Sequence, residues 1–136
     1  MVVRIHHIGI AVRSIREALK VFRDGLHLAV EHTETVDDQG VRVAFLPVGD
    51  TRLELLEPTS EEGPVASFLR RRGEGIHHVC LEVKDIEAVL EELKKAGIRL
   101  VDDQPRMGAQ GSRIAFLHPS STHGVLLELH EEHQCH

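Results

Sequence analysis

The sequence predicts an α+β protein made of two tandem βαβββ modules. Together the modules are expected to form a curved, mixed sheet that encloses a cleft and carries the helices on its convex side. The stretch IHHIGIAV at residues 5–12 returns as IHHVCLEV at residues 76–83, and each copy is followed by a helical pattern and three strand-like runs. Because 136 residues are about one ordinary domain, the two copies are expected to bury their sheets together, as a single domain over 1–136.

The first module is expected to span about residues 1–60. Apolar residues alternate with polar or small ones from Ile8 to Val12, which is the period of a strand with one packed face. Ser14 is a suitable N-cap, with a glutamate three residues later, and helical spacing then continues to a stop at Gly25. Three further strands are predicted, at residues 28–36, 40–49 and 51–58.

A connecting helix is predicted at about residues 64–72, where the chain reads PVASFLRRR between a leading proline and Gly73. The second module, about residues 75–132, repeats the order, with a helix that stops at Gly97. Its later strands are predicted at residues 98–105, 113–119 and 123–131. The short C-terminal tail that ends the chain is expected to be disordered.

The charge and composition exclude several kinds of partner. The net charge is −6, so nothing favours nucleic acid or an anionic membrane surface. Apolar runs stay far below the roughly 20 residues that a spanning helix needs, and the start MVVRIHH has no signal-peptide pattern. Cys80 and Cys135 lack paired spacing, which argues against a disulfide framework and a thiolate metal site. A reducing, cytoplasmic compartment is the expectation.

The eleven histidines are the anomaly in this composition, and the doubled pairs are their most regular feature. Successive residues of a strand face opposite sides of the sheet. If the apolar residues of each first strand face the helices, His7 and His78 point into the cleft. The neighbouring His6 and His77 then lie on the helix side and are expected to be dispensable for any site in the cleft.

Glu54 and Glu128 occupy comparable places in the last strand of the two modules. Together with His7 and His78 they would form an N2O2 site for one divalent metal, with Zn, Mn, Co, Ni and Fe(II) all compatible. A single histidine at a strand end is more simply explained by an ordinary hydrogen bond. Glu128 inside VLLEL is harder to explain in that way, because an uncompensated buried charge costs several kcal/mol.

Five segments carry a resemblance to a known family: HHIGIAV, LPVGDTRLELLEP, GPVASFLRRRGEGIHHVCLEV, GAQGSRIAFLHP and GVLLEL. Through them the chain resembles the methylmalonyl-CoA epimerase family of the vicinal-oxygen-chelate (glyoxalase) superfamily over nearly its whole length. The resemblance implies a homodimeric, metal-dependent enzyme acting on an acyl-CoA. Its reaction would interconvert (2R)- and (2S)-methylmalonyl-CoA by proton transfer at C2, through an enolate that the metal stabilises.

The resemblance also implies roles for particular residues. His7, His78 and Glu128 stand where the family has metal ligands, and Glu54 stands where some members have a glutamine near or on the metal. Glu128 is expected to carry a proton as well as bind metal, with Glu54 as the weaker candidate for the opposite face of C2. Val43 departs from the pattern, because some members have a glutamate there that is proposed as a base. The second base is therefore not carried over.

Four arginines and one serine are weaker candidates for substrate contacts. Arg70, with Arg71 and Arg72, could meet the phosphates of CoA, since a guanidinium suits phosphate geometry. The alternative is a solvated helix C-terminus that the helix dipole favours. Ser112 and Arg113 could approach the substrate carboxylate, and ordinary hairpin chemistry explains them equally well.

Two other kinds of function stay open at this point. Another metal enzyme of the superfamily, such as a glyoxalase-like lyase or an extradiol-type dioxygenase, would use the same ligands. A metal-free small-molecule binding module would not need all four ligand-type residues. Analysis of bound metal separates the binding module from the enzymes.

Overall fold

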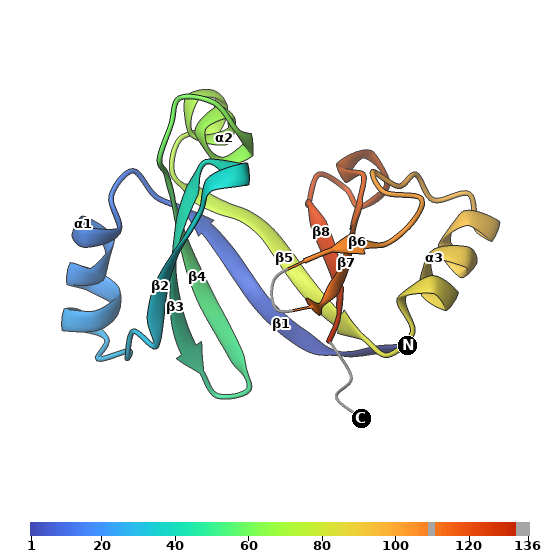
Figure 1. The fold of residues 1–136 in the computed structure, drawn as a ribbon, viewed down its shortest axis with the longest axis horizontal. Coiled ribbons are helices and arrows are strands. Elements are labelled where there is room, and N and C mark those ends of the chain that lie inside the picture. Colours follow the sequence, from blue (N-terminus) through green and yellow to red (C-terminus); the bar gives the residue numbers. More distant parts are fainter. Residues whose placement is uncertain (109–110, 133–136) are drawn as a thin grey trace. The chain divides into compact units, whose positions relative to one another are not determined.

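The structure is a computed structural model that describes residues 1–108 and 111–132 of the chain. The chain divides into two compact units (Figure 1). Unit 1 combines Met1–His6 with the described residues from His78 onward, and unit 2 is His7–His77. Within the described residues, no helix is long and apolar enough to cross a membrane.

Unit 2 contains four strands in the order β2-β3-β4-β1 and the helices α1 and α2. The strands are β1 (Val2–Ala11), whose first residues belong to unit 1, β2 (His32–Val36), β3 (Val41–Val48) and β4 (Thr51–Pro58). β1 runs parallel to β4, whereas β2–β3 and β3–β4 are antiparallel. Helix α1 (Ile15–Leu19) continues as a π-helical turn over Lys20–Gly25, and a 3-10 turn at Asp37–Gln39 joins β2 to β3.

The sheet of unit 2 is covered by a different helix on each face. On one face α1 packs into a cluster of Val12, Ile15, Leu19, Ala44, Leu46 and Leu55. On the other face α2 (Pro64–Arg72) packs into a cluster of Ala11, Val41, Val43, Phe45, Leu56, Val65 and Leu69. The two lists take alternate residues of β3 and β4, as strand geometry requires. The side chain of Glu54 therefore shares the α2-covered face with Leu56.

Unit 1 repeats this plan with strands in the order β5-β8-β7-β6 and the helix α3. The elements are β5 (Gly75–Val83), α3 (Ile86–Lys95), β6 (Arg106–Met107), β7 (Arg113–Leu117), a 3-10 turn (Pro119–Ser121) and β8 (Leu127–Glu131). β5 is parallel to β8, and the remaining pairs are antiparallel. The apolar face of this sheet packs against α3 through Val83, Ile86, Val89, Leu90, Ala115, Leu117 and Leu129.

The helix that follows the first strand of each module begins in the same way. Ser14 accepts a hydrogen bond from the Glu17 N–H at 3.1 Å, and Asp85 accepts one from the Ala88 N–H at 3.1 Å. In each module, a glutamate near the end of the last strand accepts the N–H of the first helical residue. Glu57 accepts from Ile15 at 2.8 Å, and Glu131 accepts from Ile86 at 2.7 Å. These carboxylates satisfy orphan donors at a helix N-terminus, so both copies fasten their helix to their sheet by one device.

The predicted α+β class with two mixed βαβββ modules is confirmed, and three strand predictions need correction, one of them at residues 123–131, where the strand covers only Leu127–Glu131. The strand expected at residues 98–105 is absent; Leu100 forms only an isolated bridge with Leu117. Val101 and Asp102 both donate their N–H to the Phe116 carbonyl, and the Asp102 carboxylate accepts the Phe116 N–H at 2.8 Å. The Asp102 carboxylate thus takes the place of a backbone carbonyl on a neighbouring strand, and it interrupts the pairing of residues 98–105 with β7. The run at 28–36 forms a strand only over His32–Val36.

The units do not coincide with the predicted modules. The chain passes from unit 1 to unit 2 between His6 and His7, and it returns between His77 and His78. Each doubled histidine thus marks a crossing point, and β1 and β5 each contribute residues to both units. The N-terminal residues of the first module accordingly help to build the unit that contains the second.

Leu90 provides a test of the unit 1 core. It is 1% exposed and packs between α3 and the sheet. We expect Leu90→Ala to lower the free energy of unfolding by about 2–5 kcal/mol, because it removes buried contacts and leaves a cavity. Chemical denaturation measures the change, and Glu91→Ala on the exposed side of α3 is the control, expected to stay within about 0.5 kcal/mol. Equal effects of the two substitutions would contradict this packing.

Candidate metal centre

Each unit contains one buried histidine–glutamate pair. In unit 2, Nδ1 of His7 lies 3.3 Å from Oε2 of Glu54. In unit 1, Nε2 of His78 lies 3.3 Å from Oε1 of Glu128. All four residues are between 5% and 8% exposed. These are the four residues that the sequence singles out as metal ligands, and the structure brings them together as two pairs.

The same strand geometry produces both pairs. Glu54 lies in the parallel β1–β4 ladder opposite Gly9, and Glu128 lies in the parallel β5–β8 ladder opposite Cys80. His7 lies two residues before Gly9, and His78 lies two residues before Cys80. Because side chains alternate along a strand, each histidine faces the same side of the sheet as the glutamate of its pair. Each glutamate also has a phenylalanine as its antiparallel partner, Phe45 in one unit and Phe116 in the other. Duplication therefore extends from the sequence to the local register.

The donor sets fit a divalent metal. Zinc and similar ions bind imidazole nitrogen and carboxylate oxygen at about 2.0–2.2 Å, so adjacent ligand atoms stand roughly 3.0–3.5 Å apart. The nitrogen–oxygen separation of 3.3 Å in both pairs falls in this range. It lies just beyond the usual 2.7–3.2 Å of an N–H···O hydrogen bond. Both carboxylates are buried, at 7% and 8% exposure, where a bound cation would stabilise their charge.

The two pairs differ in one respect that the sequence analysis missed. Nε of Arg52 donates to Oε2 of Glu54 at 2.9 Å, and the Arg52 guanidinium lies over the Phe45 ring at 4.7 Å. The carboxylate oxygen that faces His7 is thus shared with a cation. The i, i+2 spacing of Arg52 and Glu54 in a strand was the available signal, because it places both side chains on one face.

The doubled histidines separate, although one of them lies differently from the prediction. His6 was expected on the helix side; its ring instead stacks on His130 at 4.0 Å, on the face of the unit 1 sheet opposite α3. The reason is the crossing of β1 between units, since His6 packs in unit 1 and His7 in unit 2. His77 packs edge-on against Phe68 of α2, with ring centroids 5.2 Å apart.

The two hairpin residues that the sequence suggested for substrate binding have different surroundings. Ser112 is 4% exposed and precedes β7, and its carbonyl accepts the Gly108 N–H at 2.9 Å. Arg113 lies on the α3 side, hydrogen-bonded to Glu87 and 3.6 Å from Glu131. The hydrogen bond with Glu87 raises the pKa of Arg113 above its usual range. The structure does not bring Arg113 together with Glu128.

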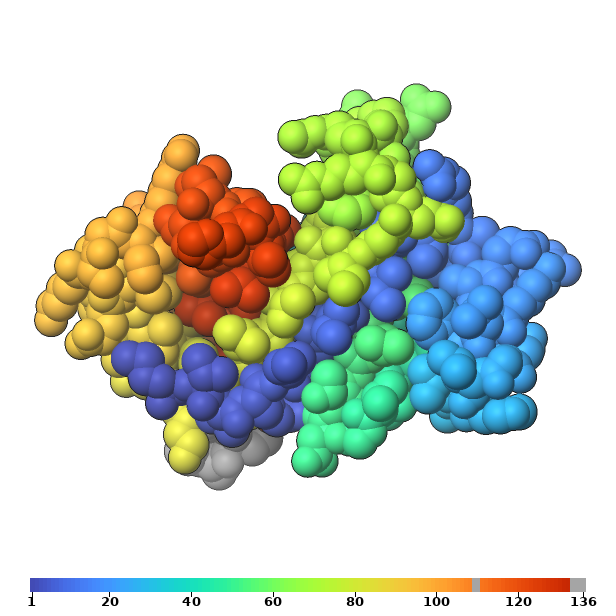
Figure 2. All heavy atoms as spheres, turned by 180° about the vertical axis from the view of Figure 1, so that it is seen from behind, coloured from blue at the N-terminus to red at the C-terminus, as the bar shows by residue number. Residues whose placement is uncertain are grey.

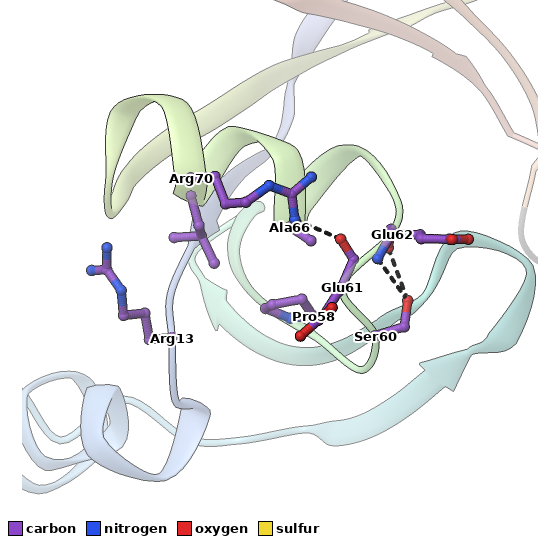
Figure 3. A pocket seen from close by; sticks show the side chains of 8 residues that line it. Arg13, Pro58, Ser60, Glu61, Glu62, Ala66 and Arg70 are labelled. Carbon is purple, nitrogen blue, oxygen red and sulfur yellow. Dashed lines mark hydrogen bonds between the residues drawn. The ribbon is translucent and has the colours of Figure 1, made fainter.

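Arg70 lines a shallow hollow of about 690 Å³ in unit 2, on the side where α2 meets the end of β4 (Figure 3). The side chain of Arg13 also borders it, and Nη1 of Arg70 donates to the Glu61 carbonyl. Ser60 and Glu62 form the polar wall, where the serine hydroxyl donates to the Glu62 carbonyl at 2.9 Å. Arg70 is therefore held at a hollow and away from the His7–Glu54 pair.

Val43, where the sequence departs from the pattern of the family it resembles, is a buried core residue. It is 6% exposed and packs in the α2-side cluster, opposite Leu56 on β4 and Glu34 on β2. A side chain without a titratable group thus occupies this position, on the face that carries Glu54.

Residues 6–116 match the Glyoxalase/Bleomycin resistance protein/Dioxygenase superfamily. The chain belongs to this superfamily. Within the glyoxalase superfamily it is 42% identical to an uncharacterised protein of Bacillus subtilis, over 96% of this chain and 99% of that one. It is 39% identical to the ethylmalonyl-CoA/methylmalonyl-CoA epimerase of Cereibacter sphaeroides, over 96% of this chain and 99% of that one.

A solved structure of the Streptomyces coelicolor methylmalonyl-CoA epimerase in complex with 2-nitronate-propionyl-CoA is similar throughout. It superimposes with a TM-score of 0.88 at 39% identity, covering 98% of this chain and 100% of that one. The resemblance to epimerases of the glyoxalase superfamily that the sequence motifs indicate is thereby confirmed.

Proposed function

We propose that this protein is a metal-dependent epimerase that interconverts (2R)- and (2S)-methylmalonyl-CoA. The observation that carries the proposal is the buried histidine–glutamate pair in each unit, His7 with Glu54 and His78 with Glu128. Its similarity to epimerases over the full chain supports the same reaction. A lyase or dioxygenase function has the superfamily in its favour, whereas the relatives reported above with a named reaction are epimerases.

The four side chains of the two pairs are proposed to hold one divalent ion. Two imidazoles and two carboxylates suit Zn, Co, Mn, Ni or Fe(II) and leave positions open for substrate oxygens. When bound, the ion supplies a Lewis acid next to the thioester, where negative charge develops as the C2 proton leaves.

The proton steps are assigned to the two glutamates. The Glu128 carboxylate takes the C2 proton, so the C–H bond breaks and its electron pair moves toward the thioester carbonyl. The protonated carboxyl of Glu54 then donates its proton to the opposite face of C2, which inverts the centre. In the reverse direction Glu54 accepts and Glu128 donates, so each turnover leaves the two carboxyls with exchanged protonation states.

Arg52 is proposed to position Glu54 for this step. Its hydrogen bond at 2.9 Å fixes Oε2, which leaves Oε1 of the same carboxyl to exchange a proton with substrate. Because Val43 carries no titratable group, the second proton carrier is assigned to Glu54, which lies on the same face of the unit 2 sheet.

Ser112 and Arg70 are the proposed contacts for the acyl-CoA. Ser112 is a buried hydroxyl beside the strand that carries Phe116, the partner of Glu128. Arg70 borders a surface hollow next to a second arginine, Arg13, where a phosphate could be received. Arg113 is already engaged by two carboxylates, so its role in substrate binding is the weakest of the three.

A homodimer in the cytoplasm is proposed for the working enzyme, as in the family that the motifs resemble. Among the described residues, Cys80 is fully buried and lies outside any disulfide, which suits a reducing compartment. Sedimentation of the purified chain measures its oligomeric state directly.

Turnover of racemic methylmalonyl-CoA, coupled to an enzyme specific for one epimer, tests the reaction. We expect complete consumption of both epimers, loss of activity on chelation and recovery when a divalent metal is returned. Ethylmalonyl-CoA should be assayed in parallel, since a relative is named for both substrates. Consumption of one epimer only, or turnover of a glutathione hemithioacetal in its place, would overturn the assignment.

A further inference from the structure

A second group of metal-ligand side chains lies wholly within unit 1, apart from the four residues already assigned. It consists of His6, Glu82, His130 and Glu132. One donor atom from each residue lies within 4.8 Å of the donor atoms of the other three. We will refer to these four residues as the unit 1 cluster.

Three separate segments build the unit 1 cluster. Glu82 on β5 and His130 on β8 are direct partners in the parallel ladder, so their side chains share one face. The His6 ring stacks on His130 at 4.0 Å with an angle of 26° between the planes. Oε1 of Glu132, just after β8, lies 3.7 Å from Nε2 of His6. Residues far apart in the sequence therefore converge on one point.

The fold does not itself require polar residues at this point. In the internal repeat, Glu82 corresponds to Ala11 and His130 corresponds to Leu56, counted from His78 and His7 and from Glu128 and Glu54. Ala11 and Leu56 belong to the apolar cluster of unit 2 under α2. The same strand positions thus serve as core in one unit and carry a carboxylate and an imidazole in the other.

Arg4 pairs with both carboxylates of the unit 1 cluster. Nη2 of Arg4 lies 3.0 Å from Oε1 of Glu82 and 3.5 Å from Oε1 of Glu132. One guanidinium thus faces two carboxylates, while His6 is 7% exposed. The Arg4 side chain is 34% exposed. Its guanidinium pairs with the same two carboxylates that a metal cation would bind, so the two would compete.

From this arrangement we infer that His6, Glu82, His130 and Glu132 form a second divalent-cation site, with Arg4 as its competitor. Two imidazole nitrogens and two carboxylate oxygens are the donors that zinc and cobalt accept. To bind one ion, the stacked rings of His6 and His130 turn out of their stack, and the donor atoms close from separations of up to 4.8 Å to the roughly 3.0–3.5 Å of bound ligands. Figure 2 shows that the N-terminal segment, in dark blue, lies at the surface, and the Glu132 side chain of the cluster is 58% exposed.

Zinc titration by calorimetry tests the site, with all proteins carrying His133→Ala and His136→Ala so that the tail histidines cannot contribute. We expect two equivalents of zinc for this background. Adding His130→Ala or Glu82→Gln should remove one equivalent, and His123→Asn, which removes an exposed imidazole elsewhere, should remove none. Arg4→Ala should tighten the second, weaker site several-fold, because it frees both carboxylates.

Cobalt provides an independent readout, since its visible absorption reports coordination by nitrogen and oxygen at each site. We expect the cobalt spectrum of the His130→Ala variant to lose the contribution of one site, with circular dichroism unchanged. One equivalent of zinc in the background protein, or an unchanged stoichiometry on His130→Ala, would overturn the inference. The His78→Ala substitution tests the metal centre of the proposed epimerase, and His130→Ala tests the unit 1 cluster. Each proposal can therefore fail without the other.

Discussion

Glu128→Gln is expected to reduce exchange of the C2 hydrogen of methylmalonyl-CoA with solvent by about 10²–10⁴-fold. A glutamine keeps the size and one oxygen of the side chain but cannot accept the proton, and general acid–base groups contribute on this scale. Deuterium incorporation from D₂O, followed by NMR or mass spectrometry, measures the exchange separately for each epimer.

A glutamate of the same strand provides the matched control. Glu131 lies three residues further along β8 and accepts the Ile86 N–H at the start of α3. Glu131→Gln should therefore lower the stability of unit 1 while leaving exchange near its original rate. Exchange at the wild-type rate in Glu128→Gln would show that another group carries this proton.

His78→Ala is expected to remove the tightly bound metal and to lower turnover at least 100-fold. The imidazole is one of four proposed ligands, and its loss leaves the Glu128 carboxylate buried without its partner at 3.3 Å. Metal analysis after dialysis, together with turnover at increasing concentrations of added metal, separates weakened binding from lost chemistry. His7→Ala should behave alike.

The adjacent histidine is the control for this prediction. His77 is the residue directly before His78, and it packs against Phe68 in unit 2. His77→Ala should keep its metal and most of its activity. Equal metal loss in both variants would mean that the effect comes from damage to the strand, and would contradict the ligand assignment.

Much of the fold could be predicted because the periodicity of the chain is strong. The connecting helix lies at Pro64–Arg72, as predicted, and the β4 strand at Thr51–Pro58 agrees in both limits. Proline, glycine and alternating apolar residues determine these limits locally. The strand expected at residues 98–105 failed for a tertiary reason, because the Asp102 side chain takes the place of a backbone partner.

The candidate site was predictable as a set of residue types, since duplication singled out two histidines and two glutamates. Alternation alone did not place His6 correctly, because it assumes that all of β1 packs in a single unit. Arg52 was missed for a different reason: an arginine in a strand is ordinary, and only its 2.9 Å contact with a buried carboxylate makes it notable.

The position of the crossing points has a consequence for how the chain acquires its structure. Unit 2 is one continuous stretch, so all of its residues are available as soon as His77 has been synthesised. Unit 1 is discontinuous, and its first six residues must wait for partners that follow His78. Contacts of such long sequence separation form late, because closing the intervening loop costs conformational entropy before the new contacts stabilise the chain. During synthesis on the ribosome, unit 2 would therefore fold first. Met1–His6 would stay unfolded until β8 emerges.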